Sequence, residues 1–205
     1  MGVRARHGLF RVACVCLTLL AGAAAPAVAD QFTDQINAPF QNVSQERRAE
    51  MVLLPLLTKM EEPPATVSDR TRAMLMQSTF AGWADAQTWA NGANQRAVID
   101  ALKAVTKESD PLKAHVFALG YGVEASPRQL VRDRMYIELG DPPTIAAAQL
   151  LYMPKLDQMV CLIHVEATRL AAEGKVSDAV DLMTSLSFFG RMMVDRPLMR
   201  EAKWG

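Results

Sequence analysis

The sequence predicts an all-α protein. Apolar residues recur at three- and four-residue intervals, and no segment between turn signals alternates apolar and polar residues as a strand would. Proline follows Asp110 and Ser126 at what would be a first helical position, and Gly120 and Gly140 stand just after expected helix ends. These observations favour about eight helices, arranged as stacked hairpins in an α-solenoid-like array or as an irregular helical bundle.

The first 29 residues are expected to be a secretory signal peptide. Three arginines precede the apolar run 12–25, and small residues stand just ahead of Asp30. Cleavage before Asp30 predicts an exported protein, periplasmic or extracellular, that has no membrane contact once the signal is removed. The alternative is that the run 12–25 stays in place as an N-terminal anchor, because its length is marginal for crossing a bilayer.

A helical domain is expected over residues 44–205, preceded by a linker or extended arm over residues 30–43. The arm lacks a helical stripe and contains Pro39. Pro55 should bend or shorten the first helix of the domain. Capping residues and apolar periodicity predict helices over 45–60, 69–90, 94–107, 111–119, 127–139, 145–153, 155–173 and 178–193.

The charge of the chain argues against a nucleic-acid-binding protein, and its cysteine content argues against a disulfide-stabilised one. The chain has 22 Lys and Arg against 22 Asp and Glu, and loss of the three signal arginines would leave 19 against 22. The chain therefore has no excess of basic residues, and its charge gives no reason to expect a nucleic-acid partner. Cys161 is the only cysteine outside the predicted signal, so no internal disulfide can form. We expect it to be a buried free thiol.

The stretch RLAAEGKVSDAVDLM, residues 169–183, predicts a helical hairpin. Gly174 can adopt the left-handed conformation that ends the first helix, and Ser177 can cap the second. The first helix is apolar on two sides, which is typical of a helix sandwiched between layers.

Residues 160–193 resemble one unit of the tetratricopeptide repeat family. The small, glycine, alanine and large-apolar positions of that repeat are matched in spacing by Ala167, Gly174, Ala179 and Met183. The sequence departs from the repeat where Leu170 replaces an aromatic residue and Arg191 replaces the closing proline. The resemblance implies a surface of stacked hairpins that binds other proteins. The alternative of equal standing is an irregular bundle whose hairpins stack for stability alone.

Motifs that carry chemistry are missing from the sequence. It contains no G-x-S-x-G, no phosphate-binding glycine loop and no H-E-x-x-H. Cys161 and His164 are three residues apart, but a metal site needs three or four ligands. We therefore predict no catalytic residue, cofactor or metal. The alternative is an enzyme or small-molecule binder with a site between helices near Trp83, His115 and His164.

The residues after the hairpin predict an interaction surface. Repeat stacks normally close with a polar capping helix, and none follows here. An open apolar face is expected from Phe188, Met192, Leu198 and Trp204. A protein or peptide partner, self-association or a continuation of the chain would cover it. The expected function is thus that of an exported, helical-repeat-like scaffold for protein or peptide interaction.

Overall fold

The computed structural model describes residues 24–205, and most of the predicted signal peptide lies outside them. In this part of the chain nine α-helices, two short 3₁₀-helices (η1 and η2) and one two-stranded sheet confirm the all-α class. The elements up to residue 106 are α2 (Ala24–Gln41), η1 (Gln45–Arg47), α3 (Ala49–Leu57), η2 (Ala65–Val67), α4 (Arg70–Leu75), α5 (Trp83–Ala90) and α6 (Ala93–Thr106). The later elements are α7 (Arg128–Arg132), β1 (Ile137–Glu138), β2 (Gln149–Leu150), α8 (Met153–Ala172), α9 (Val176–Val194) and α10 (Met199–Ala202).

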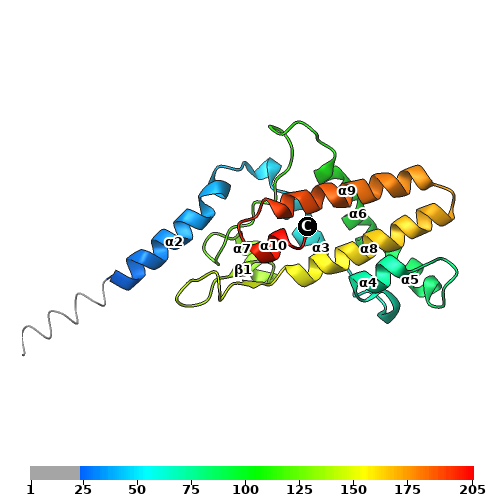
Figure 1. The fold of residues 1–205 in the computed structure, drawn as a ribbon, viewed down its shortest axis with the longest axis horizontal. Coiled ribbons are helices and arrows are strands. Elements are labelled where there is room, and N and C mark those ends of the chain that lie inside the picture. Colours follow the sequence, from blue (N-terminus) through cyan, green and yellow to red (C-terminus); the bar gives the residue numbers. More distant parts are fainter. Residues whose placement is uncertain (1–23) are drawn as a thin grey trace, which may run out of the picture.

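The antiparallel hairpin of α8 and α9 is the frame of the fold (Figure 1). Gly174 turns the chain between them with φ +77°, as predicted. Lys175 rather than Ser177 precedes the first helical residue of α9, so the predicted cap is wrong. On the sides of the hairpin, α4 and α5 pack against α8, and α6 packs against α9. Other helices of the same chain therefore cover the hairpin on two sides.

Apolar periodicity places the core between these helices. The buried side chains of α9 recur at three- and four-residue intervals and meet the buried row of α8, and both rows contact α6. The main members are Leu156, Met159 and Ile163 of α8, Ala179, Leu182, Phe189 and Met193 of α9, and Val98, Ile99 and Leu102 of α6. One buried carboxylate, Glu166, adds a polar tie, because it accepts hydrogen bonds from Arg169 of α8 and Arg96 of α6.

The predicted helix 69–90 is two helices. Gly82 interrupts it with φ +87°, and a Cβ at Gly82 would lie 2.5 Å from the side chain of Thr66. The chain leaves the helical conformation of α4 at Met76, where ψ is 131°, and Gly82 stands directly before α5. The cap of α4 is Asp69, since its carboxylate accepts a 2.9 Å hydrogen bond from the backbone N–H of Arg72.

The predicted helix 111–119 is wrong. Residues 116–121 are extended, and Val116 exchanges backbone hydrogen bonds with Arg47 (2.8 Å) and Ala49 (3.0 Å). Every side chain from Phe117 to Leu119 is fully buried. A run buried on all sides needs no helical face, and pairing with residues 47–49 satisfies its backbone instead.

Two further predicted helices are also wrong in large part. Of 127–139 only α7 is helical, after which Arg134 adopts φ +56° and the chain enters β1. Of the predicted helix 145–153, only Met153 is helical, as the first residue of α8. Its residues 149 and 150 form β2, antiparallel to β1. Tertiary pairing therefore replaces helix formation between α6 and α8.

Residues 30–43 form most of α2 rather than a linker or extended arm. Pro39 lies in the last turn of this helix, where only a few residues follow it. Asn37 and Phe40 are buried against the body, while the start of α2 points away from it (Figure 1). The predicted cleavage point before Asp30 falls within α2, so a cleaved chain would keep the packed part. None of the helices in residues 24–205 is both long and apolar enough to cross a bilayer.

Candidate functional site

The four residues of the predicted open face do not form one surface. Phe188 is 57% exposed, but Leu198 is only 4% exposed. Met192 and Trp204 are half-buried and pack against the core. The expectation of a single open apolar face at this end is therefore wrong, although Phe188 itself is exposed.

A buried polar centre explains why the residues after α9 are covered. The carboxylate of Glu201 in α10 accepts hydrogen bonds from the hydroxyls of Tyr121 and Tyr152 and from Nε of Arg196 at 3.0 Å. Arg196 also donates to the carbonyl of Leu119 at 2.7 Å. Burial raises the pKa of both tyrosines, so their hydroxyls remain donors. This centre draws the segment after α9 back against the body, so that the end of the chain lies beside α9 (Figure 1).

The last residues of the chain lie against the hairpin. The indole N–H of Trp204 donates to Asp157 at 2.9 Å, and the Arg70 guanidinium lies 4.4 Å from the Trp204 ring centre. Gly205 lies so close to Gly190 of α9 that a Cβ at Gly190 would come within 3.1 Å of the Gly205 carbonyl oxygen. Trp204 and Gly205 therefore cover the α8/α9 seam at this end.

Beyond this cover, the seam between α8 and α9 is an open groove of about 520 Å³. A further recess of about 220 Å³, which Arg70, Trp204 and Gly205 help to line, shares His164 and Ser187 with it. The side chains of the groove are His164, Ala167, Thr168 and Ala171 from α8, and Val176, Ala179, Val180, Met183, Thr184 and Ser187 from α9. We call these ten residues the seam groove. Among them no Asp, Glu, Lys or Arg occurs.

A second apolar row on α9 forms one wall of the seam groove. The first row, including Leu182 and Phe189, faces the core. The second row passes through Val176 and Val180, four residues apart and therefore on one side of the helix. These two valines are 59% and 58% exposed. Neither valine was predicted as part of a site, although their four-residue spacing beside the core row is a signal in the sequence that indicates an exposed apolar row.

Cys161 and His164 lie on α8 near this groove but have different surroundings. Cys161 is a buried free thiol, as predicted, and burial and nearby Asp157 raise its pKa to about 11. His164 lines the groove and is half-buried. Burial, together with the positive charge of Arg70, lowers the pKa of His164. Its ring therefore favours the neutral form, which keeps the groove uncharged near neutral pH.

The alternative site near Trp83, His115 and His164 is not formed as one cavity. The recess and groove that His164 lines include neither Trp83 nor His115. His115 lies in the loop after α6, and its buried Nδ1 makes no hydrogen bond with the described part of the chain. Within residues 24–205, no group of three or more His, Cys, Asp or Glu side chains is arranged to hold a metal ion.

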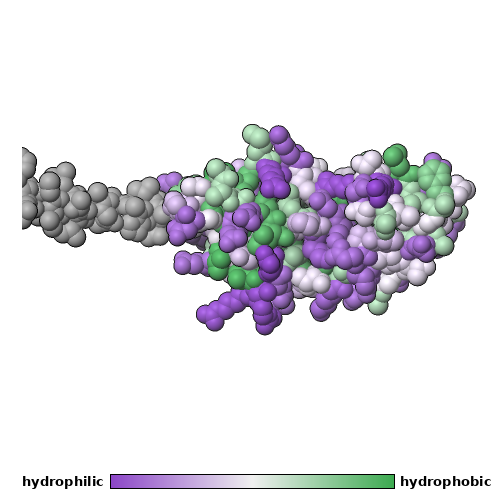
Figure 2. Space-filling model, turned by 90° about the horizontal axis from the view of Figure 1, so that it is seen from below, coloured by the Kyte–Doolittle hydropathy of each residue, from purple (hydrophilic) through white to green (hydrophobic). Residues whose placement is uncertain are grey.

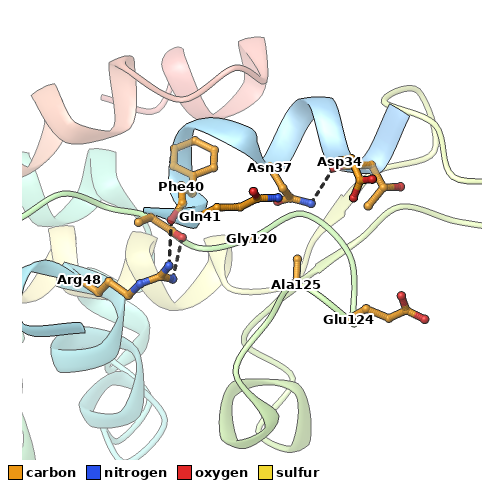
Figure 3. Close-up of a pocket in the computed structure, with 10 residues that line it drawn as sticks. Asp34, Asn37, Phe40, Gln41, Arg48, Gly120, Glu124 and Ala125 are labelled. Carbon is orange, nitrogen blue, oxygen red and sulfur yellow. Dashed lines mark hydrogen bonds between the residues drawn. The ribbon is translucent and has the colours of Figure 1, made fainter. Parts of the chain in front are cut away.

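A second cavity, of about 300 Å³, lies beneath α2 (Figure 3). Two of the polar side chains that line it, Asn37 and Arg48, bind backbone groups of the same chain. The Asn37 side chain both donates to and accepts from the backbone of Tyr121, at 2.9 and 2.7 Å. Arg48 donates to the carbonyls of Phe40 (2.9 Å) and Ala118 (3.3 Å). These contacts hold α2 in place, so Asn37 and Arg48 have a structural role in this cavity.

Exposed apolar side chains at the end of the molecule that carries α7, β1 and α10 do not gather in an uncharged groove. Figure 2 shows them interleaved with hydrophilic side chains at the end that carries α7, β1 and α10. Two exposed apolar residues, Val123 and Ile145, lie in the segment between α6 and α8. Val123 borders a hollow that is also lined by four carboxylates: Asp34, Glu124, Glu138 and Asp141. Isolated apolar side chains of this kind are normal on protein surfaces.

The seam groove is thus the strongest candidate site by geometry. It is open and shallow, and it is lined by apolar and small side chains with a few hydroxyl groups. Comparison of the chain with models of protein families, with curated proteins and with solved structures finds no match in any of the three. The functional argument therefore rests on the geometry of this groove.

Proposed function

We propose that this chain is an exported protein-binding helical domain, which takes an apolar segment of a protein or peptide partner into the seam groove. The single observation that carries the proposal is the uncharged groove with Val176 and Val180 exposed on its wall. Contiguous apolar surface is rare on a protein unless it is covered by a partner. No catalytic role is part of the proposal.

The energetic basis is the burial of the exposed wall. Full burial of an aliphatic side chain contributes about 1.5–3 kcal/mol, so the two partly exposed valines offer roughly half that each. The floor adds contact area, because Ala167 and Ala171 have small side chains that allow a partner to approach closely. Since no ionised group lies in the lining, a partner need not desolvate a charge to bind.

The resemblance to a tetratricopeptide unit supports the same proposal. Three of the four matching residues, Ala167, Ala179 and Met183, line the seam groove, and Gly174 forms the turn at its end. In stacked repeats each hairpin buries its open face against a neighbour. Here a partner would take the place of that neighbour.

Selection of binding peptides from a random displayed library tests this function. Peptides selected on the purified protein should bind a Val180→Glu variant at least tenfold more weakly, because the variant places a charge on the apolar wall. An Ile145→Glu variant is the matched control, since Ile145 is 53% exposed and lies outside the groove. Selected peptides that bind all three proteins equally would contradict the proposal.

A further inference from the structure

We propose that the occupant of the seam groove is a single amphipathic α-helix of a partner protein, which lies along α8 and α9 and completes a three-helix bundle. This inference rests on the proposed function and specifies the class of partner. It follows from the shape of the groove, from the hydrogen-bonding groups that line it, and from its charge.

The shape fits a helix. Ala167 and Ala171 are one turn apart on α8, and Val176 and Val180 are one turn apart on α9. Two rows with this spacing present ridges and hollows that accept side chains at positions i, i+3, i+4 and i+7 of a third helix. The small alanine side chains let the two helix axes approach closely. Because α4 and α5 pack on α8 and α6 packs on α9, the seam is the open side of the hairpin.

The hydrogen-bonding groups of the groove favour a helical segment over an extended one. An extended peptide needs partners for its own backbone N–H and C=O groups. The groove is lined by two helices whose backbones are bonded internally, and its polar side chains are mainly hydroxyls. One of these, Ser187, already donates to the carbonyl of Met183 at 3.0 Å. A helix satisfies its own backbone and therefore needs no such groups from the groove.

The groove also limits the length and charge of the occupant. Its wall runs from Val176 to Ser187, which corresponds to about 16 Å or three helical turns at 1.5 Å per residue. Farther along α9, Trp204 and Gly205 of the chain itself lie over the seam. The chain's own tryptophan at this position shows that the seam accepts a large apolar side chain. An uncharged lining requires a partner face without Asp, Glu, Lys or Arg, because a buried unpaired charge is costly.

The test uses two designed peptides of about 16 residues with fluorescent labels. The helical probe has leucine and alanine at i, i+3, i+4 and i+7, with glutamine, glutamate and lysine on the other face. The proline probe has the same sequence with two central residues changed to proline, which prevents a continuous helix. Fluorescence anisotropy is measured with the wild type, Val180→Glu and Ile145→Glu. Circular dichroism checks that each variant is folded, which the exposure of both positions favours.

The expected result is saturable binding of the helical probe that is at least tenfold weaker for Val180→Glu, unchanged for Ile145→Glu and at least tenfold weaker for the proline probe. Equal binding of the proline probe, or no binding of the helical probe, would overturn the helical occupant. The proposed function would then still be decided separately by the selected peptides. Binding that ignores Val180→Glu would place the probe elsewhere and also overturn the inference. Concentration-dependent dimers that Val180→Glu abolishes would identify a second copy as the occupant instead of a partner.

Discussion

The α8/α9 hairpin and the segment between α6 and α8, residues 107–152, differ in what fixes their backbone. In the hairpin, each helix satisfies its own hydrogen bonds and apolar rows join the two. Residues 107–152 contain only α7 and two short strands. Their buried backbone is satisfied by distant groups such as Asn37, Arg196 and Glu50, whose carboxylate accepts from the N–H of Ala118 at 2.8 Å.

This difference determines where each region is vulnerable. A hairpin held by apolar rows loses stability in proportion to the volume removed from its core. A segment held by buried polar side chains loses stability when one partner is removed, because the group left behind remains buried without a partner. Substitutions of matched exposure in the two regions can separate the two mechanisms.

The largest effect is expected for Glu201→Ala. The change leaves the buried Arg196 guanidinium without its carboxylate and two tyrosine hydroxyls without an acceptor. Loss of one partner of a buried ion pair costs about 3–5 kcal/mol of unfolding free energy. Urea denaturation followed by circular dichroism measures it. Glu124→Ala, at an exposed position, is the control and should change stability by no more than about 0.5 kcal/mol. Equal effects of the two changes would show that the polar centre does not stabilise the fold.

A cavity in the hairpin is expected to have the next largest effect. Leu182→Ala removes a fully buried side chain of α9, and such truncations cost about 2–5 kcal/mol. Val180→Ala, two residues away on the exposed wall, should cost only about 0.5 kcal/mol or less. Thermal and urea unfolding compare the two variants. If they are equally destabilised, the assignment of a core row and a groove row on α9 is wrong.

Loss of the contact that holds α2 should have a smaller effect. Asn37→Ala leaves the buried backbone N–H and C=O of Tyr121 without the side-chain amide that binds both. An unsatisfied buried group costs about 1–3 kcal/mol. Hydrogen exchange should show faster exchange of the Tyr121 amide, and urea unfolding gives the free energy. The exposed neighbour Gln41→Ala should leave both unchanged. Slow exchange at Tyr121 in Asn37→Ala would mean that α2 does not depend on this contact.

The turn of the hairpin is expected to tolerate some residues but not others. Gly174→Ala keeps the space, since no atom lies within 4 Å of the added Cβ, but places alanine at φ +77°. The left-handed conformation costs about 1–2 kcal/mol for a residue with a Cβ. Gly174→Asn should cost less, because asparagine adopts this conformation more readily. Thermal unfolding of both variants tests the order, and an alanine variant as stable as wild type would contradict it.

The smallest effect concerns pH and His164. Its pKa is lowered in the folded chain by burial and by Arg70, so the unfolded chain binds the proton more readily. Stability should therefore fall as the pH drops below the ordinary histidine value of about 6.5. His164→Gln should show a shallower loss between pH 7 and pH 5 when unfolding free energy is measured at each pH. Equal losses of unfolding free energy for the two proteins over this pH range would show that protonation of His164 does not affect the stability of the fold.

Prediction from sequence succeeded where a segment satisfies its own backbone. The hairpin, α6 and the buried thiol of Cys161 were predicted correctly, because helical periodicity alone separates a buried face from an exposed one. The predicted helix over 94–107 and α6 differ by only a residue at each end.

The same reasoning failed where apolar residues are consecutive. In the run from Phe117 to Leu119 all side chains are buried, so it has no exposed face by which a helix and an extended segment can be distinguished. For residues 30–43 the prediction was wrong in the opposite sense, because an irregular segment was predicted where the chain is helical. Pro39 suggested an irregular arm, but it lies in the last turn of α2, so the hydrogen bond that it lacks affects only the end of the helix and leaves the earlier turns intact.

The sequence by itself determined the all-α class and the position of the long hairpin, because both depend on contacts between residues a few positions apart. Only the tertiary structure decided where the chain goes after α9. The Glu201 carboxylate must meet Tyr121 and Tyr152, which are 80 and 49 positions away, and no local pattern records such a meeting. That contact buries Leu198 and draws Trp204 over one end of the seam. The apolar surface left open is therefore the seam groove rather than the predicted face, because burying the Arg196–Glu201 ion pair in the core fixed the path of the chain around it.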